Sequence, residues 1–140
     1  MPRIVDGDNL LGGWPGRTRS QADKRRLSHE LARLSRREGR EIVLVFDGPE
    51  PVGVAFGGRT RFAGQGQSAD ALILGHLRQQ QDPRGWVVVT DDRSLGDQAR
   101  WVGARVERCQ TLRDRLAGGG EEKPGGQDDL DYWKDVFGVE

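Results

Sequence analysis

Residues 42–49 read Ile42-Val43-Leu44-Val45-Phe46-Asp47-Gly48-Pro49, an apolar and largely β-branched run that ends in an acid and a turn. A continuous apolar run of this kind is typical of a strand buried on both faces, as in the centre of a parallel sheet. Two shorter segments, residues 2–5 and 86–89, are also strand candidates; Asp6 directly follows the first, and Asp91 and Asp92 follow the second after Thr90. We therefore expect a mostly parallel sheet that contains all three runs.

Residues 20–38 carry the signals of an amphipathic helix. Ser20 and Asp23 form a capping-box-like start, in which an acid stands three residues after a hydroxyl side chain. Gly39 supplies the expected stop, because glycine readily adopts the left-handed conformation that ends many helices. Three leucines at helical spacing form the expected buried face: Leu27, Leu31 and Leu34.

Shorter segments complete the expected order of elements. We expect helices over residues 69–81, 94–102 and 111–116, and strands over residues 52–56 and 104–108. Residues 7–16 and 57–67 are rich in glycine and are expected to be loops. This order predicts an α/β fold of three layers, in which helices cover both faces of a mostly parallel sheet.

Composition divides the 140 residues into three segments. Residues 1–117 are the expected single domain, and residues 118–128 are a glycine-rich, acidic linker. Residues 129–140 are an acidic segment whose apolar side chains are spaced for one helical face: Leu130, Trp133 and Phe137. We expect this segment either to dock, on its own domain or on a protein partner, or to pack as an ordinary terminal helix.

The net charge of zero conceals an asymmetry between the domain and the tail. Of the 22 basic and 22 acidic side chains, two and seven lie in residues 118–140, which leaves 20 and 15 in residues 1–117. Nearly all the cations of the domain are arginines, whose planar fork of donors suits phosphate. The asymmetry favours a polyanionic partner for the domain, although arginine also serves simply to keep a protein soluble.

Several classes of protein are disfavoured by the composition. The single cysteine, Cys109, can form neither an internal disulfide nor a zinc site, so a reducing cytoplasm is the expected setting. No apolar run approaches the ~20 residues of a membrane span, and the first residues lack the pattern of a signal peptide. The mean hydropathy of −0.72 places the chain among the more polar globular proteins.

Four acids stand where a parallel sheet would bring them together. Asp6, Asp47 and Asp92 follow three of the strand candidates, and Asp70 lies in the first turn of the helix expected from residue 69. Sites in open α/β sheets form outside the carboxyl ends of the strands. Carboxylates gathered there repel one another, and a hard divalent cation offsets the repulsion. The pattern therefore predicts a Mg²⁺ or Mn²⁺ site suited to the hydrolysis of phosphodiesters.

Each of these acids also has an ordinary structural interpretation. Asp6 and Asp47 are common turn residues, Asp70 is a favourable acid near a helix N-terminus, and Asp92 is a helix cap. Taken singly, Asp70 and Asp92 fit the structural role better than the catalytic one. Four such coincidences on one sheet edge are less probable than one site, so the combination favours chemistry.

Four short motifs resemble those of the NYN domains, and in particular the YacP-like branch of the PIN-like nuclease superfamily. They cover Val5–Gly12, Val45–Gly48, Phe62–Ile73 and Val88–Arg93, and read VDGDNLLG, VFDG, FAGQGQSADALI and VVTDDR. Their order and spacing match over roughly residues 3–117. Each motif is weak alone, whereas four in order are fairly specific.

The resemblance implies a PIN-like fold and a Mg²⁺- or Mn²⁺-dependent nuclease that acts most often on RNA. It implies that Asp6, Asp47, Asp70 and Asp92 are the catalytic, metal-binding acids. It also implies that Asn9 orients the first acid or contacts the substrate.

Three positions depart from the family pattern. Asp8 replaces the usual aromatic residue and adds a carboxylate near the site. Asp91 precedes Asp92, and because neighbouring side chains at a strand end point to opposite sides, we expect only Asp92 in the site. Ser94 stands where many relatives have a further acid, which weakens the expectation of two metal ions.

Basic and aromatic residues near the acids are expected to bind substrate. Arg17 and Arg19 follow the first glycine-rich segment, Arg59 and Arg61 precede Asp70, and Arg93 follows Asp92. These five arginines are expected to flank the acidic edge and to hold phosphates, although each could equally be a solvated loop charge. Trp14 either stacks on a base or anchors its loop. By contrast, Trp86 and Trp101 fit core positions.

The sequence thus predicts an endoribonuclease that cleaves single-stranded or loop RNA and leaves a 5′-phosphate. Its main rival is an RNA-binding module that kept the fold and lost activity, a reading that Ser94 favours. A flap-type nuclease acting on DNA is a weaker rival, because the chain has little room for accessory helices.

Overall fold

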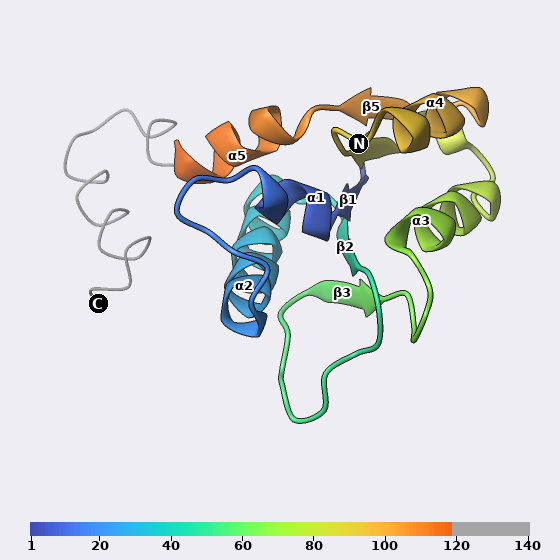
Figure 1. Cartoon of the computed structure of the whole chain (residues 1–140). Helices are drawn as coiled ribbons and strands as arrows, with labels where there is room; N and C mark the ends of the chain where they lie inside the picture. The colour runs from blue at the N-terminus through green and yellow to red at the C-terminus, as the bar shows by residue number, and fades with distance from the viewer. Residues whose placement is uncertain (119–140) are drawn as a thin grey trace.

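The structure is a computed structural model, and it describes residues 1–118. Its middle layer is a five-stranded sheet in the order β3-β2-β1-β4-β5, in which every pair of neighbours is parallel (Figure 1). The strands are β1 (Arg3–Asp6), β2 (Ile42–Phe46), β3 (Arg59–Phe62), β4 (Val87–Val89) and β5 (Arg105–Glu107). The helices are α1 (Gly7–Gly12), α2 (Gln21–Glu38), α3 (Ala69–Arg78), α4 (Arg93–Trp101) and α5 (Cys109–Ala117), with a 3₁₀ turn at Pro83–Gly85.

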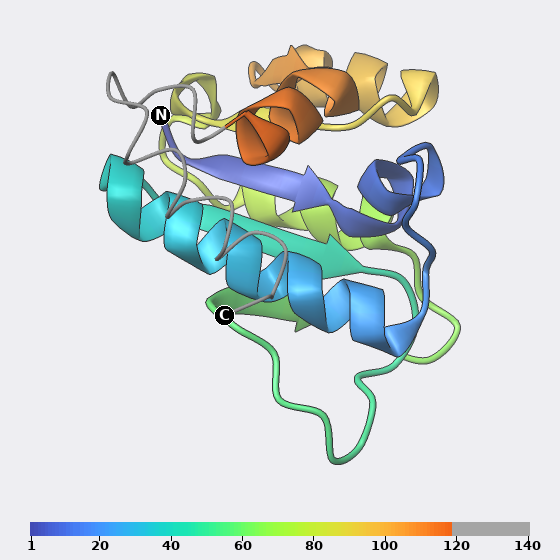
Figure 2. The same ribbon diagram turned by 90° about the vertical axis from the view of Figure 1, so that its left-hand side faces the viewer.

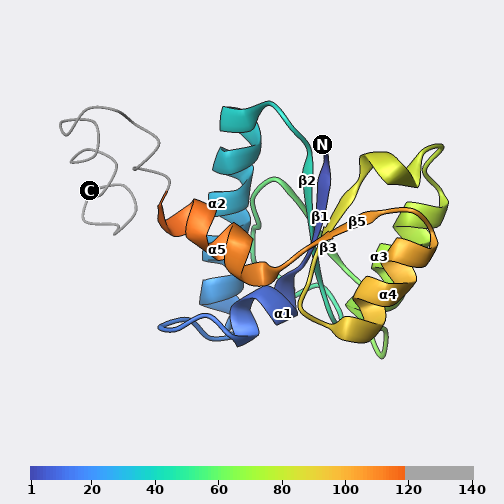
Figure 3. The same cartoon turned by 90° about the horizontal axis from the view of Figure 1, so that it is seen from above.

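Helices cover both faces of the sheet, as the sequence predicted. Helices α1, α2 and α5 lie on one face and α3 and α4 on the other (Figure 3). Every residue of β2 is buried, and its side chains pack against the helices on both faces of the sheet. Val43 and Val45 pack with α3 and α4, whereas Leu44 and Phe46 pack with the leucines of α2. The three-layer α/β fold is confirmed.

Parallel pairing brings the carboxyl ends of the strands to one edge. Figure 2 shows the arrows of β1 and β2 pointing the same way. Asp6 at the end of β1 pairs with Val45, one residue before the end of β2. On its other side β1 pairs with β4 in the same direction, Val5 opposite Val89. The chain therefore leaves β1, β2 and β4 at neighbouring points, which is the arrangement that the candidate site requires.

Helix α2 forms as its sequence predicted. The side chain of Ser20 accepts a hydrogen bond from the backbone N–H of Asp23 at 3.1 Å, and Gly39 ends the helix with φ of 67°. The three predicted leucines are buried. The first turn of α2 lies at the carboxyl edge of the sheet (Figure 2), where Lys24 approaches Asp8 to 3.6 Å.

Two predictions about local structure are wrong. Residues 7–12, expected in a loop, form the short helix α1, which Gly7 allows to sit directly on β2: a Cβ there would collide with the ring of Phe46. The strand expected over residues 52–56 is absent, and that segment is a turn and loop with Val52 98% exposed. The third strand in chain order is instead β3, inside the segment expected to be a loop.

The sequence does not predict strand β3, because this strand lies at the edge of the sheet and has no apolar run. Its side chains alternate between exposed and half-buried. Phe62 fixes it in place through ring contacts with Phe46 and Phe56, at centroid distances of 5.4 and 5.0 Å.

The prediction of a buried Trp101 is also wrong, since this side chain is 90% exposed at the end of α4. Leu95 and Ala99 form the buried face of that helix, and Trp101 lies off their face. Trp86 is buried, as predicted. None of the helices within residues 1–118 combines the length and the apolar character needed to cross a membrane.

Candidate active site

The four predicted acids line one cleft at the carboxyl edge of the sheet. Asp6 ends β1, Asp47 follows β2, Asp70 is the second residue of α3, and Asp92 is the N-cap of α4. The cleft has a volume of about 290 Å³, and its lining residues are Asp6, Asp8, Asn9, Arg19, Asp47, Ser68, Asp70 and Asp92.

Asp6 is the most buried of the four acids that line the cleft and is only 5% exposed. Its Oδ2 accepts a hydrogen bond from the Thr90 hydroxyl at 3.1 Å. The pKa of Asp6 is raised to about 7, mainly by burial and also by the charges of Asp70 and Asp47, although hydrogen bonds from Thr90 and from the backbone amide of Asn9 oppose the rise. The carboxylate form of Asp6 therefore needs a cation or another donor to be fully populated at neutral pH.

Asp70 is the second acid of the cleft whose pKa is raised. Burial is the main cause that raises its pKa, followed by the charges of Asp92 and Asp47. The charges that raise the pKa of Asp70 thus belong to two other acids that line the same cleft.

Asp47 is held in place from two sides. Its Oδ1 accepts a hydrogen bond from the backbone N–H of Ala69 at 2.6 Å, which ties the end of β2 to the first turn of α3. Its own backbone N–H donates to Oδ2 of Asp8 at 2.7 Å. Lys24 Nζ lies 3.6 Å from the other oxygen of Asp8. Asp8, the departure from the family pattern, thus anchors the backbone of a predicted catalytic acid.

Of the adjacent acids Asp91 and Asp92, the structure places Asp92 in the cleft, as expected. Oδ1 of Asp92 accepts from the backbone N–H of Leu95 at 3.1 Å, and its own N–H donates to the Thr90 hydroxyl oxygen at 3.0 Å. Asp91 turns to α5 instead, where its Oδ1 accepts from the backbone N–H of Cys109 at 3.0 Å.

Asn9 supports the site from its other end. Its side-chain oxygen accepts from the backbone N–H of Asp91 at 2.6 Å and lies 3.2 Å from the buried thiol of Cys109. Burial raises the pKa of that thiol to about 12, so it remains protonated and is the donor of this contact. Asn9 therefore orients the strand end that carries Asp92 and also influences Asp6 through its backbone.

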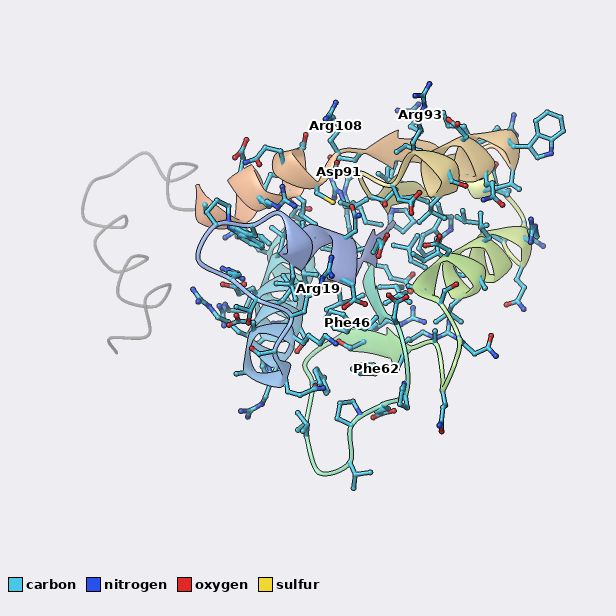
Figure 4. All side chains as sticks on the ribbon, in the orientation of Figure 1. Arg19, Phe46, Phe62, Asp91, Arg93 and Arg108 are labelled. Atoms are coloured by element: carbon cyan, nitrogen blue, oxygen red, sulfur yellow. The ribbon has the colours of Figure 1, made fainter. Side chains whose placement is uncertain are left out.

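Arg19 is the arginine that lines the cleft. Its Nε donates to the backbone carbonyl of Asp8 at 3.1 Å, and its guanidinium passes so close to Gly12 that a Cβ there would collide with it. Figure 4 shows its side chain beside α1.

The neighbouring loop residues Arg17 and Trp14 have structural partners. Arg17 makes a two-pronged ion pair with Glu30, at 2.6 and 3.0 Å, and its guanidinium lies 3.7 Å from the centre of the Trp14 ring. Trp14 is half-buried against the α2 side of the core. Of the two alternatives for Trp14, the geometry favours the anchoring of its loop.

The remaining arginines do not converge on the acids. Arg59 begins β3 at the amino end of the sheet and pairs with Glu41, so the prediction that it flanks the acidic edge is wrong. Arg61 is exposed on β3. Burial lowers the pKa of His76 on α3, and the charges of Arg61 and Arg59 lower it further from its ordinary value. Arg93 is exposed, and Figure 4 shows it extending outward from α4, away from Arg19.

A sequence model of the YacP-like NYN domain matches residues 3–118. The chain belongs to this family. Two solved structures share its fold: Rae1 (YacP) from Bacillus subtilis, and the W164L mutant of that protein. The first is 18% identical, with a TM-score of 0.68 over 99% of this chain and 81% of the other. The mutant is 19% identical, with the same TM-score over 83% and 74%.

These comparisons establish the class of the domain. The resemblance seen in the four motifs is confirmed, and the chain is a PIN-like nuclease-type domain of the YacP-like NYN family. The two structures show a shared fold at low sequence identity. No curated protein matches the chain.

The family implies a divalent metal ion, and the donor set of this NYN domain suits one. The cleft offers carboxylate oxygens, which Mg²⁺ and Mn²⁺ prefer. Among residues 1–118, no three acidic, histidine or cysteine side chains are close enough together to hold one metal ion. Mg²⁺ is usually held by only one or two carboxylates, with water and substrate phosphates as the other ligands. The residues present fit that open mode of binding.

The sequence did not predict the roles of two supporting residues of this NYN domain, although Asp8 was expected near the site. Thr90 joins Asp6 to the backbone of Asp92, and Asp8 joins Lys24 to the backbone of Asp47. Thr90 follows a buried strand and precedes two acids, which was an available signal. The function of Asp8 carried no such signal, because it depends on how α1 packs on β2.

Proposed function

We propose that this NYN domain is a Mg²⁺- or Mn²⁺-dependent endoribonuclease that acts on single-stranded or loop RNA. The observation that carries the proposal is the gathering of Asp6, Asp47, Asp70 and Asp92 around one cleft, in a chain of the YacP-like NYN family. The raised pKa values of Asp6 and Asp70 support it, because like charges are kept together at a cost that a bound cation offsets.

One or two of the four carboxylates would hold the cation, with water and a phosphate of the substrate as its other ligands. A divalent cation supplies two effects there: it lowers the pKa of a bound water, and it neutralises the charge that develops on the phosphate. One carboxylate oxygen of Asp47 and one of Asp92 accept a hydrogen bond from a backbone amide, which fixes the orientation of the side chain. The second oxygen of each acid would then be free to bind the cation in a fixed position.

The other cleft residues would position the RNA. Arg19 is placed to bind a phosphate next to the scissile one, since its guanidinium has further donors besides the Nε bound to Asp8. Hydrolysis adds water to phosphorus and expels the 3′ oxygen of the preceding nucleotide. The products would carry a 3′-hydroxyl and a 5′-phosphate.

A second candidate is an RNA-binding module without significant activity. Two observations favour it. The family's further acid is replaced by Ser94, whose hydroxyl is occupied by Gln98 at 3.2 Å. Also, within the described part of the chain no three potential ligands are preassembled for one metal ion.

One experiment separates the candidates. Purified protein is incubated with 5′-labelled single-stranded RNA, hairpin RNA and single-stranded DNA of the same sequence, with Mg²⁺, Mn²⁺ or EDTA. The nuclease proposal predicts metal-dependent cleavage in which the labelled fragment ends in a 3′-hydroxyl and the other fragment begins with a 5′-phosphate. Binding of RNA without any fragment in either metal would refute it and support the binding module.

A further inference from the structure

The outward face of α2 is basic over most of its length. The buried face of this helix is formed by Leu27, Ser28, Leu31 and Leu34. At 100° per residue, five exposed arginines fall within a sector of about 120° on the opposite side. They are Arg25, Arg26, Arg33, Arg36 and Arg37.

The acids of α2 lie outside this sector, and each binds a donor from another segment. Asp23 accepts from the backbone N–H and the hydroxyl of Thr18, at 2.7 and 2.9 Å. Glu30 is bound by both donors of Arg17, and Glu38 by Arg3 and Arg115. These acids are therefore largely committed to cations and donors of other segments, although Glu30 also lies 3.5 Å from Arg26.

Such a face is unfavourable for a helix that only needs to be soluble. Arg33 is followed by arginines three and four positions later, and like charges at these spacings repel one another on a helix. A solvated helix usually interleaves acids with bases, so that neighbouring side chains attract. A polyanion that lies along the face would remove this repulsion.

The basic face begins beside the candidate active site. Arg19 in the cleft directly precedes Ser20, the N-cap of α2, and Lys24 in the first turn reaches Asp8. Figure 2 shows α2 starting near the ends of the strands and running back along the sheet. The distance from Arg25 to Arg36 along the helix is about 16 Å, about five phosphates at the ~3.4 Å axial spacing of a stacked strand.

We propose that the outward face of α2 binds the phosphate backbone of the RNA strand that continues from the cleft. The proposal rests on the proposed function and adds to it a path for the RNA. Arg19 and the arginines of α2 hold the strand on one side of the scissile bond. Because guanidinium–phosphate contacts read no base, this part of the binding is independent of sequence.

The test is the salt dependence of RNA binding by the full chain. The anisotropy of a labelled 20-nucleotide single-stranded RNA is measured between 50 and 200 mM KCl in EDTA, so that no hydrolysis occurs. For single strands, the slope of log affinity against log salt is about −0.7 per neutralised phosphate. The double variant Arg33→Gln, Arg36→Gln should therefore flatten the slope by about 1.4 and weaken binding at every salt concentration.

The matched control removes the same charge from other faces of the molecule. Arg78 ends α3 and Arg105 begins β5, and both are exposed. The variant Arg78→Gln, Arg105→Gln should keep the wild-type slope. A labelled tetranucleotide, which is too short to extend from the cleft along α2, should lose less affinity than the 20-mer in the α2 variant.

Two results would overturn the proposal. One is a wild-type slope in the α2 variant. The other is tighter RNA binding by that variant, as expected if an acidic segment, such as residues 118–140, covers this face instead. The experiment needs no catalysis: binding through α2 by a protein that never cleaves RNA would refute the nuclease and leave this proposal standing.

Discussion

At the scale of single residues, the acids of the cleft combine two functions that sequence reasoning treated as alternatives. Asp92 caps α4 and Asp47 accepts the first amide of α3, while both line the same cleft. A backbone amide is a rigid donor, so a carboxylate that caps a helix is also a carboxylate held still. The structural role of these acids is thus a reason for their precise placement and no argument against chemistry.

Asp8 should act as a positioning residue for Asp47. Asp8→Ala removes the acceptor of the Asp47 N–H, so we expect a loss of about 1–2 kcal/mol in the free energy of unfolding and a reduced kcat. Asp8→Asn keeps an acceptor oxygen and should recover most of both. The measurements are urea unfolding and RNA cleavage kinetics, with the exposed Asp114→Ala as the control. Equal losses in the Ala and Asn variants would contradict this role.

The buried Asp6 should make the metal-free protein less stable as the pH rises. Its pKa is about 7 in the folded protein and ordinarily 3.8, so between these values the folded state holds a proton that the unfolded state has released. Stability therefore falls with rising pH across this window and levels off above it. The full effect of such a difference is about 4 kcal/mol, an upper bound.

Asp6→Asn, which cannot ionise, tests this expectation. In EDTA at pH 8 the variant should have a higher Tm than the wild type, and the difference should shrink toward pH 4. Mg²⁺ or Mn²⁺ should raise the Tm of the wild type more than that of the variant, because a ligand stabilises the state that binds it. A variant that is less stable than the wild type at pH 8 would show that Asp6 is not under electrostatic strain.

At the scale of elements, the short helix α1 organises the site. Its consecutive residues Asp8 and Asn9 reach in opposite directions along the sheet edge, to the backbone N–H of Asp47 after β2 and to that of Asp91 after β4. The strand between them, β1, carries Asp6. The six residues of α1 therefore set the relative positions of the ends of β1, β2 and β4.

Helix α5 holds α1 in turn through a buried arginine. Arg113 is 6% exposed, and its Nε and Nη2 donate to the carbonyl of Leu10 at 3.0 and 2.9 Å. Arg113→Met would leave this carbonyl without its donors, so we expect a loss of about 2 kcal/mol in the free energy of unfolding and weaker RNA cleavage. Arg108→Met, an exposed change on the same segment, should alter neither measurement. Full RNA cleavage by the Arg113 variant would contradict the claim that α5 supports the active site through α1.

The elements that sequence reasoning found and missed differ in a physical way. The buried strands and α2 were predictable because their apolar spacing and caps are local signals. Helix α1 was not, since its glycine-rich sequence is helical only where Gly7 packs on Phe46 and Arg113 binds its last carbonyls. Strand β3 was hidden because an edge strand buries only alternate side chains.

At the scale of the whole molecule, the topology explains why the acids could be predicted and the arginines could not. Parallel strands deliver their carboxyl ends to one edge, so chain position alone places Asp6, Asp47 and Asp92 together. The position of a long side chain depends on its partners: Arg17 is bound by Glu30 and Arg59 by Glu41, and Arg19 alone of the five predicted arginines lines the cleft.

The central claim is that the carboxylate cleft cleaves RNA with a divalent cation, and single-turnover cleavage in Mn²⁺ tests it most directly. Wild type, Asp47→Asn, Asp70→Asn and the exposed control Asp97→Asn are compared on the same labelled RNA. The account predicts that the two cleft variants lose at least about 100-fold in rate, the scale of lost transition-state stabilisation, while the control and the wild type agree. Equal cleavage by all four proteins, or by none, would contradict it.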